Sequence, residues 1–169
     1  LRQRGLLKES VNVLNTGGIV RLARLILRGT LLFEGVGAII LTLCFWRDMP
    51  FHQALYYGIF HSISAFCNAG FDLMGAFGMS SFTGYNANWV VCLTLMALIL
   101  IGGIGFFVWS DLKEHKLHFR KYALHTKIVL VTSVILTVVP TILFWILERH
   151  ALFADMSGSQ ALLNALFCA

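Results

Sequence analysis

Residues 60–73 constrain the fold of this chain more than any other stretch. They lie between two long apolar segments, yet they are too polar and too interrupted to cross a bilayer. A short helix that runs into Asn68-Ala69-Gly70-Phe71 is typical of a segment that enters a membrane partway and returns as extended backbone. Because non-helical backbone at membrane depth persists only where protein or a water-filled cavity surrounds it, this stretch indicates a conduction path.

The composition places the chain in a membrane. Hydrophobic residues make up 58% of the 169 residues, charged residues make up 12%, and the mean hydropathy is +0.79. Ordinary globular chains are about half apolar and about a quarter charged. A soluble core of this size cannot hide that much apolar surface, so the sequence predicts an all-α membrane protein in contact with the lipid bilayer.

Three apolar segments have the roughly 20 residues that a spanning helix needs. We expect these spans at about residues 25–46, 89–109 and 128–147. Two shorter helices should enter the membrane without crossing it, one at 51–66 and one that begins at 159.

The remaining segments are expected to be connections. Residues 1–24 form the first, with Asn15-Thr16-Gly17-Gly18 as a turn or a loose linker, and residues 110–127 form a second. Asp48-Met49-Pro50 is expected to start the helix at 51, with Asp48 capping its free amides.

Most basic residues lie in these two connections, before the first span and at 110–127. This asymmetry follows the positive-inside rule and predicts a multi-pass protein of the cell membrane whose N-terminal end is cytoplasmic. The formal charge of +5 therefore does not indicate nucleic-acid binding. The four cysteines lie in or beside apolar stretches without metal-like spacing, which favours packing over a disulfide framework or a zinc site.

The chain contains a repeat. Gln53-Ala54-Leu55, followed by Phe60, matches Gln160-Ala161-Leu162, followed by Phe167, at an offset of 107 residues. Each copy follows an apolar span that ends in aromatic residues and an arginine. The second copy's glycine would fall beyond Ala169, so we expect the chain to be a fragment that stops inside a second short helix.

The loop at 67–71 carries the chemistry of a cation path. Backbone carbonyls replace the hydration shell of potassium without adding net charge. We expect Asn68, Ala69 and Gly70 to contribute carbonyls, with Cys67 and Phe71 as further candidates. Gly70 permits positive φ and keeps the lumen clear. Phe71 should pack its ring behind the loop, whereas a simple Asn-x-Gly turn is the alternative reading of the same residues.

Other polar residues and glycines in these segments have a structural interpretation, and several also have a functional one. Glu34 lies within the first span and either makes a structural hydrogen bond or supports the ion path. His61 is expected to be buried and locally hydrogen-bonded, Asp72 to lie in a vestibule or a solvated loop, and Gly102-Gly103-x-Gly105 to allow close helix packing or a hinge.

These residues resemble a known family. Residues 62–71 look like the second pore loop of the Trk/Ktr/HKT superfamily of potassium transporters, and 102–106 resemble the glycine-rich segment of the helix that follows. Residues 5–12 and 18–22 resemble the approach to the second repeat in bacterial Ktr-type membrane subunits. The resemblance covers nearly the whole chain.

The resemblance implies span–pore loop–span repeats around a pseudo-fourfold axis, in a potassium-channel-like fold. The second repeat would occupy residues 25–109 and the start of the third 128–169, with Gly70 as the filter glycine. Family members usually form dimers and bind a cytoplasmic nucleotide-binding regulatory subunit, which the basic connection would contact.

The function predicted in this way is potassium uptake through a pore, without catalytic residues, a cofactor or a resident metal. A sodium-permeable or sodium-coupled member of the same superfamily remains an alternative. So does a broken-helix carrier for another solute, although such carriers typically aim helix N-termini at anions. A non-conducting structural fragment is the third alternative.

Overall fold

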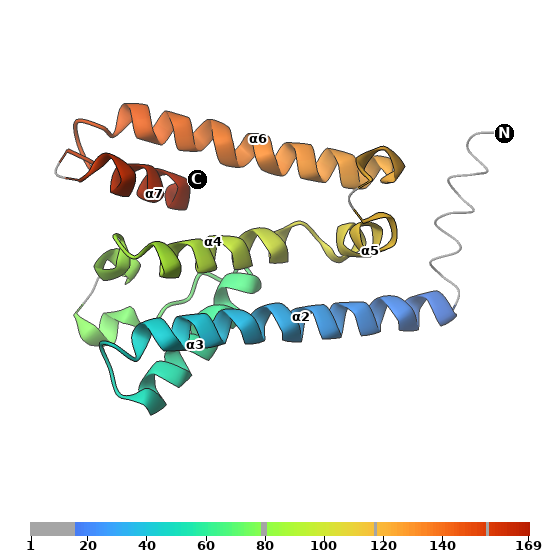
Figure 1. Ribbon diagram of the computed structural model, residues 1–169, viewed down its shortest axis with the longest axis horizontal. Helices are drawn as coiled ribbons and strands as arrows, with labels where there is room; N and C mark the ends of the chain where they lie inside the picture. The colour runs from blue at the N-terminus through green and yellow to red at the C-terminus, as the bar shows by residue number, and fades with distance from the viewer. Residues whose placement is uncertain (1–15, 79–80, 117, 155) are drawn as a thin grey trace. The chain divides into compact units, whose positions relative to one another are not determined.

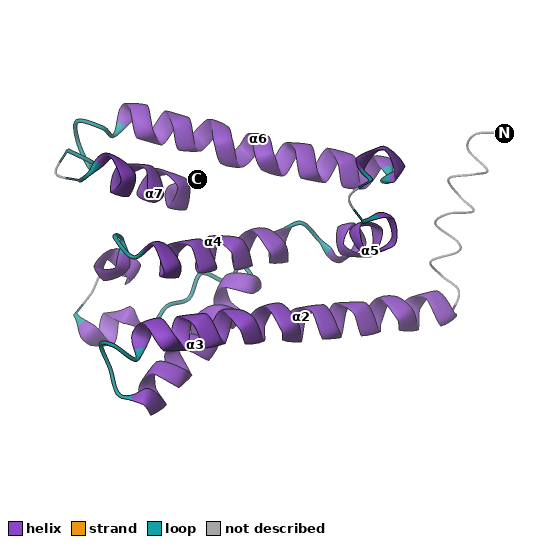
Figure 2. Ribbon diagram, viewed as in Figure 1, coloured by secondary structure: helices purple, strands orange, loops and turns teal. Residues whose placement is uncertain are grey.

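The computed structural model describes residues 16–78, 81–116, 118–154 and 156–169. Every regular element within these ranges is helical (Figure 2). The chain divides into two compact units, residues 1–32 and 33–169, and the first long helix begins in one unit and ends in the other.

The regular elements of the described residues are all helices, which follow one another along the chain (Figure 1). The α-helices are α2 (Thr16–Phe45), α3 (Phe51–Phe66), α4 (Trp89–Gly103), α5 (Phe106–His115), α6 (Leu124–Leu147) and α7 (Gly158–Cys168). Three short 3-10 helices connect them: η1 (Met74–Phe77), η2 (Ser81–Tyr85) and η3 (Phe119–Lys121).

Two segments, Leu22–Phe45 and Leu124–Leu147, are each long and apolar enough to cross a membrane. A third candidate is the pair α4 and α5, which passes the same test together but is bent by 92°. The prediction of an all-α membrane protein is confirmed.

Helix α2, the first among the described residues, begins earlier than the sequence suggested. Thr16, Gly17 and Gly18 belong to α2, so the predicted turn is wrong for these residues, while Asn15 lies outside the described residues. Threonine and glycine are both tolerated at a helix start, and the apolar run that follows favours continuation of the helix.

Asp48 does not cap α3. The N-cap is Pro50, and no side chain caps this helix end. The Asp48 carboxylate instead accepts a hydrogen bond from the hydroxyl of Tyr85 at 2.9 Å. Burial, together with this hydrogen bond and the charge of Asp48, raises the pKa of Tyr85 well above its usual value, so the hydroxyl remains a donor. The contact ties the end of α2 to η2.

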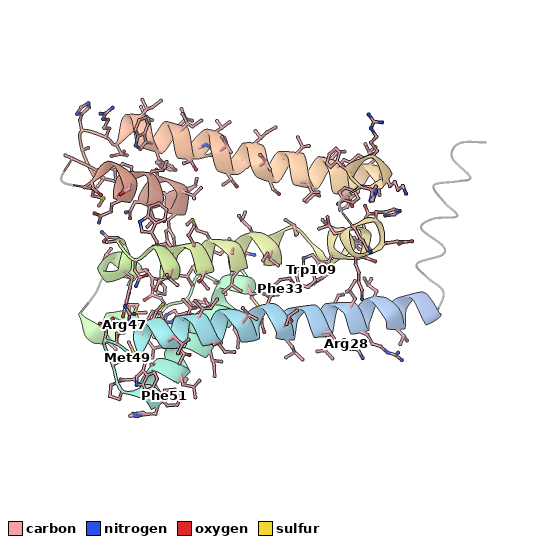
Figure 3. The ribbon with its side chains drawn as sticks, in the orientation of Figure 1. Arg28, Phe33, Arg47, Met49, Phe51 and Trp109 are labelled. Atoms are coloured by element: carbon pink, nitrogen blue, oxygen red, sulfur yellow. The ribbon has the colours of Figure 1, made fainter. Side chains whose placement is uncertain are left out.

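The predicted span at 89–109 is divided into two helices. α4 ends at Gly103, and Gly105 adopts a φ of +88°, a conformation that favours glycine, before α5 begins. The indole N–H of Trp109 then donates to the carbonyl of Ile101 at 3.0 Å, and its ring contacts Phe33 at a centroid distance of 5.2 Å (Figure 3). The bend therefore buries Trp109.

The segment at 110–127 is largely helical, because α5 extends into it and α6 begins within it. The Asp111 carboxylate accepts a hydrogen bond from the amide of Ala123 at 2.9 Å and pairs with His115 Nδ1 at 2.8 Å. These contacts fix the end of α5 to the start of α6.

Glycines allow three helices to pack closely in the second unit. A Cβ on Gly58 would lie 2.2 Å from Thr42 Oγ1, and a Cβ on Gly37 would lie 2.6 Å from Ser62 Oγ, so α2 and α3 cross at close range. A Cβ on Gly102 would lie 1.9 Å from the carbonyl oxygen of Phe66. Gly102 thus permits the close packing predicted for the glycine-rich segment, whereas the hinge stays a prediction.

The internal repeat has a structural counterpart. α3 begins at Phe51 and α7 begins at Gly158, so the two helix starts are 107 residues apart. Their N-caps, Pro50 and Ser157, have the same spacing.

The contact at Gly102 generates a testable prediction. Gly102→Ala should destabilise the protein by about 1–3 kcal/mol, because the added methyl group meets backbone rather than a movable side chain. The measurement is thermal unfolding of the detergent-solubilised protein.

Gly103→Ala is the matched control. The nearest atom to a Cβ there is Asn68 Nδ2 at an ordinary 3.6 Å, so this variant should unfold at or above the wild-type temperature. Equal stability of the two variants would contradict the predicted clash.

Candidate functional site

The loop at 67–71 uses its amides but leaves most of its carbonyls free. The amides of Cys67, Asn68 and Ala69 donate back to the last turn of α3, to the carbonyls of Ile63, Ala65 and Ser64 at 2.9, 3.1 and 2.9 Å. Within the described part of the chain, the carbonyls of residues 67–70 accept no hydrogen bond. Four consecutive carbonyl oxygens are therefore available to an external cation.

Two residues of the loop have left-handed backbone. Asn68 has a φ of +53° and Gly70 a φ of +72°. No atom lies within 4 Å of a Cβ built on Gly70, so the backbone conformation, rather than a steric clash, calls for glycine. The side-chain amide of Asn68 also contacts α4, where its Nδ2 donates a hydrogen bond to the carbonyl of Ile99 at 3.4 Å.

Phe71 does not pack behind the loop. Its side chain is 71% exposed, so that prediction is wrong for the contacts made within this chain. The backbone of Phe71 is instead fixed by Ser64, whose hydroxyl donates a hydrogen bond to the Phe71 carbonyl at 2.7 Å. Asp72 accepts a hydrogen bond from the amide of Met74 at 3.0 Å, so the carboxylate also stabilises the start of η1.

His61 is buried behind the loop, as predicted, and only 1% of it is exposed. Its Nδ1 lies 2.7 Å from the carbonyl of Tyr57, one turn earlier in α3. Its Nε2 accepts a hydrogen bond from the amide of Leu73 at 3.1 Å. The second contact was not foreseen, because Leu73 is twelve residues further along the chain and no local pattern links the two.

Glu34 approaches the beginning of the loop. Its backbone carbonyl accepts a hydrogen bond from Ser62 Oγ at 2.7 Å, and its carboxylate oxygen Oε1 lies 4.0 Å from Cys67 Sγ. Among the described residues it forms no ion pair. Glu34 thus accepts a hydrogen bond through its backbone carbonyl and a second one, from the Cys67 thiol, through its carboxylate.

The site is suited to binding a cation through backbone oxygen. The described residues contain no group of three or more histidine, cysteine or carboxylate side chains that could hold a metal ion, and the four cysteines are free. The C-terminal end of α3, which carries partial negative charge, leads directly into the free carbonyls. The helix end and the free carbonyls favour a cation at this position.

Comparison with known proteins identifies the family of the chain. Residues 2–169 match the family model TrkH, described as cation transport protein. The chain belongs to this family. The resemblance to Trk/Ktr-type transporters is thereby confirmed, and the family is one of transporters rather than enzymes.

Three relatives illustrate the similarity. The chain is 35% identical over 163 residues to the potassium/sodium uptake protein NtpJ of Enterococcus hirae, covering 95% of this chain and 35% of the relative. It is 38% identical over 151 residues to the Ktr system potassium uptake protein B of Vibrio alginolyticus, covering 89% and 32%. The protein of the same name in Bacillus subtilis is 32% identical over 148 residues, covering 88% and 32%. The chain therefore spans about a third of the length of these relatives.

The charge of Glu34 can be tested separately from its volume. If the full-length subunit takes up potassium, as proposed below, Glu34→Gln should lower its rubidium uptake at subsaturating concentrations about fivefold, because it removes a negative charge near Cys67 while leaving the backbone contact with Ser62 in place. Glu34→Asp, which keeps the charge, serves as the control and should retain more of the uptake. Wild-type uptake by Glu34→Gln would restrict Glu34 to a structural role.

Proposed function

We propose that the chain forms part of the pore of a potassium uptake subunit, in which residues 67–71 line one quarter of the selectivity filter. The observation that carries this proposal is the row of carbonyls at 67–70 that accept no hydrogen bond within the described chain. Asn68, Ala69 and Gly70 bind the ion, Cys67 contributes at the end next to α3, and Phe71 contributes less because Ser64 already occupies its carbonyl.

Selectivity arises from the exchange of water for carbonyl oxygens. A potassium ion that enters the loop loses hydration water and gains carbonyl ligands, which the protein holds in place through the amides that donate back to α3. The negative end of α3 adds a favourable field for the dehydrated ion. No step changes a covalent bond, and no cofactor takes part.

One loop cannot surround an ion, so the proposal requires further copies. In this proposal α3 is the pore helix of the second repeat and α7 that of the third, and both are re-entrant. The common offset of 107 residues supports this reading, as does the length of the relatives. The remaining loops belong to parts of the subunit outside this chain.

The proposed arrangement in the membrane follows the basic residues. The N-terminal end and the segment at 110–127 face the cytoplasm, as the positive-inside rule indicates. The subunit forms a homodimer, and a nucleotide-binding regulatory subunit contacts the basic segment. The name shared by two relatives, Ktr system potassium uptake protein B, supports a system with more than one component.

Sodium is the second candidate ion, because one relative is named a potassium/sodium uptake protein. A carrier for an anionic solute is less favoured, since the free loop follows the C-terminal end of α3 and offers carbonyl oxygens rather than amides.

Gly70 provides the direct test. The experiment measures rubidium uptake, with and without competing sodium, in cells that lack their own potassium transporters and express the full-length subunit. Gly70→Ser should lower rubidium uptake about tenfold or more, or abolish its preference over sodium, because the side chain strains the left-handed backbone that orders the carbonyls.

Gly78→Ser is a matched control. Gly78 has a φ of +71° and, like Gly70, no atom within 4 Å of an added Cβ, but it lies after η1 and outside the filter. The control should transport like wild type at equal protein levels. If both variants match wild type, Gly70 is an ordinary turn residue and the proposed filter is wrong.

A further inference from the structure

The chain after Gly70 is held from behind by two side chains of α3. Leu73 donates its amide to His61 Nε2 at 3.1 Å, and its carbonyl accepts a hydrogen bond from the Tyr57 hydroxyl at 3.2 Å. One residue of the returning segment is thus fixed through both of its backbone polar groups. Ser64 fixes a second point, at the Phe71 carbonyl.

The contacts of His61 determine its protonation state. The Tyr57 carbonyl can only accept a hydrogen bond, so Nδ1 must carry the proton. The Leu73 amide can only donate, so Nε2 must carry a lone pair. Only the neutral tautomer with hydrogen on Nδ1 satisfies both contacts, because the imidazolium form would place two donors against each other at Leu73.

The surroundings hold the imidazole in this orientation. Aromatic rings contact it, at centroid distances of 4.8 Å for Phe82, 5.5 Å for Phe60, 5.7 Å for Tyr57 and 5.9 Å for Phe45. The nearby carboxylate of Asp72 is engaged with the amide of Met74. The ring therefore has a fixed position from which its two nitrogens reach the pore helix and the returning segment.

We propose that His61 is a positioning residue for ion selection, which sets the C-terminal end of the filter loop by holding Leu73. This inference rests on the proposed function. The carbonyls of residues 67–70 are fixed at one end by amides that donate to α3, and the other end depends on Phe71 and Leu73. Loss of the His61 contact frees the C-terminal end of the filter loop, so the carbonyls adapt to a smaller ion as readily as to potassium.

The test compares two substitutions of His61 in the full-length subunit. His61→Leu fills the space but offers no acceptor to Leu73, whereas the side-chain oxygen of His61→Gln can take the place of Nε2. At matched protein levels, His61→Leu should reduce the preference for rubidium over sodium about fivefold through a change in apparent KM rather than in the maximal rate, and His61→Gln should restore part of it.

Two further measurements test the role of His61 independently of His61→Leu transport. Hydrogen exchange of the Leu73 amide should be slower in wild type than in His61→Leu, a readout that does not depend on transport. Tyr57→Phe removes only the hydroxyl that donates to the Leu73 carbonyl, and it should shift the ion preference in the same direction by a smaller factor. This variant tests the proposal even if His61→Leu does not reach the membrane.

An unchanged preference in Tyr57→Phe and in any His61→Leu protein that reaches the membrane would overturn the inference, as would unchanged exchange at Leu73. Absence of uptake by wild type would instead count against the proposed function, and the exchange measurement would still test the contact. His52→Leu, at an exposed histidine in the first turn of α3, is the control for substitution of histidine and should behave like wild type.

Discussion

The contact between α4 and the end of α3 underlies the geometry of the loop. The Phe66 carbonyl lies so close to Gly102 that no side chain fits between them, and Trp109 packs its ring against Phe66 from the other side of the bend, at a centroid distance of 5.7 Å. Phe66 is the last residue of α3, so these contacts fix the point at which helical backbone gives way to the loop. Every later carbonyl is placed relative to that point.

The loop separates its donors from its acceptors. Its amides satisfy the last turn of α3, which would otherwise have unpaired carbonyls, and this leaves its own carbonyls without partners. In a helix or a sheet each residue uses both groups internally, so neither could bind an ion. The left-handed residues Asn68 and Gly70 interrupt the regular pattern and make the separation possible.

The features that could be predicted from the sequence are those with a local signal. The bounds of α3 matched the expected 51–66, and the repeat correctly indicated a second short helix near 159, because apolar length, polarity and helix-breaking residues are all visible within a short window. The membrane class followed from composition alone.

The features that were missed depend on contacts between distant residues. Asp48 is a plausible cap by its position, but it binds Tyr85, 37 residues later. Phe71 was expected to hold the loop because it is aromatic, while a serine seven residues earlier does so instead. The bend after Gly103 was also hidden, because the apolar run continues through it and only the φ of Gly105 and the burial of Trp109 reveal it.

The two related helix starts show how the same position can be stabilised in different ways. Pro50 makes no side-chain bond at the start of α3, but its ring restricts the backbone before folding and so lowers the entropy lost on forming the helix. Ser157, at the equivalent position before α7, accepts a hydrogen bond from the Gln160 amide at 3.3 Å and acts in the folded state. One start is thus preorganised in the unfolded chain, while the other gains its stability only once the helix exists.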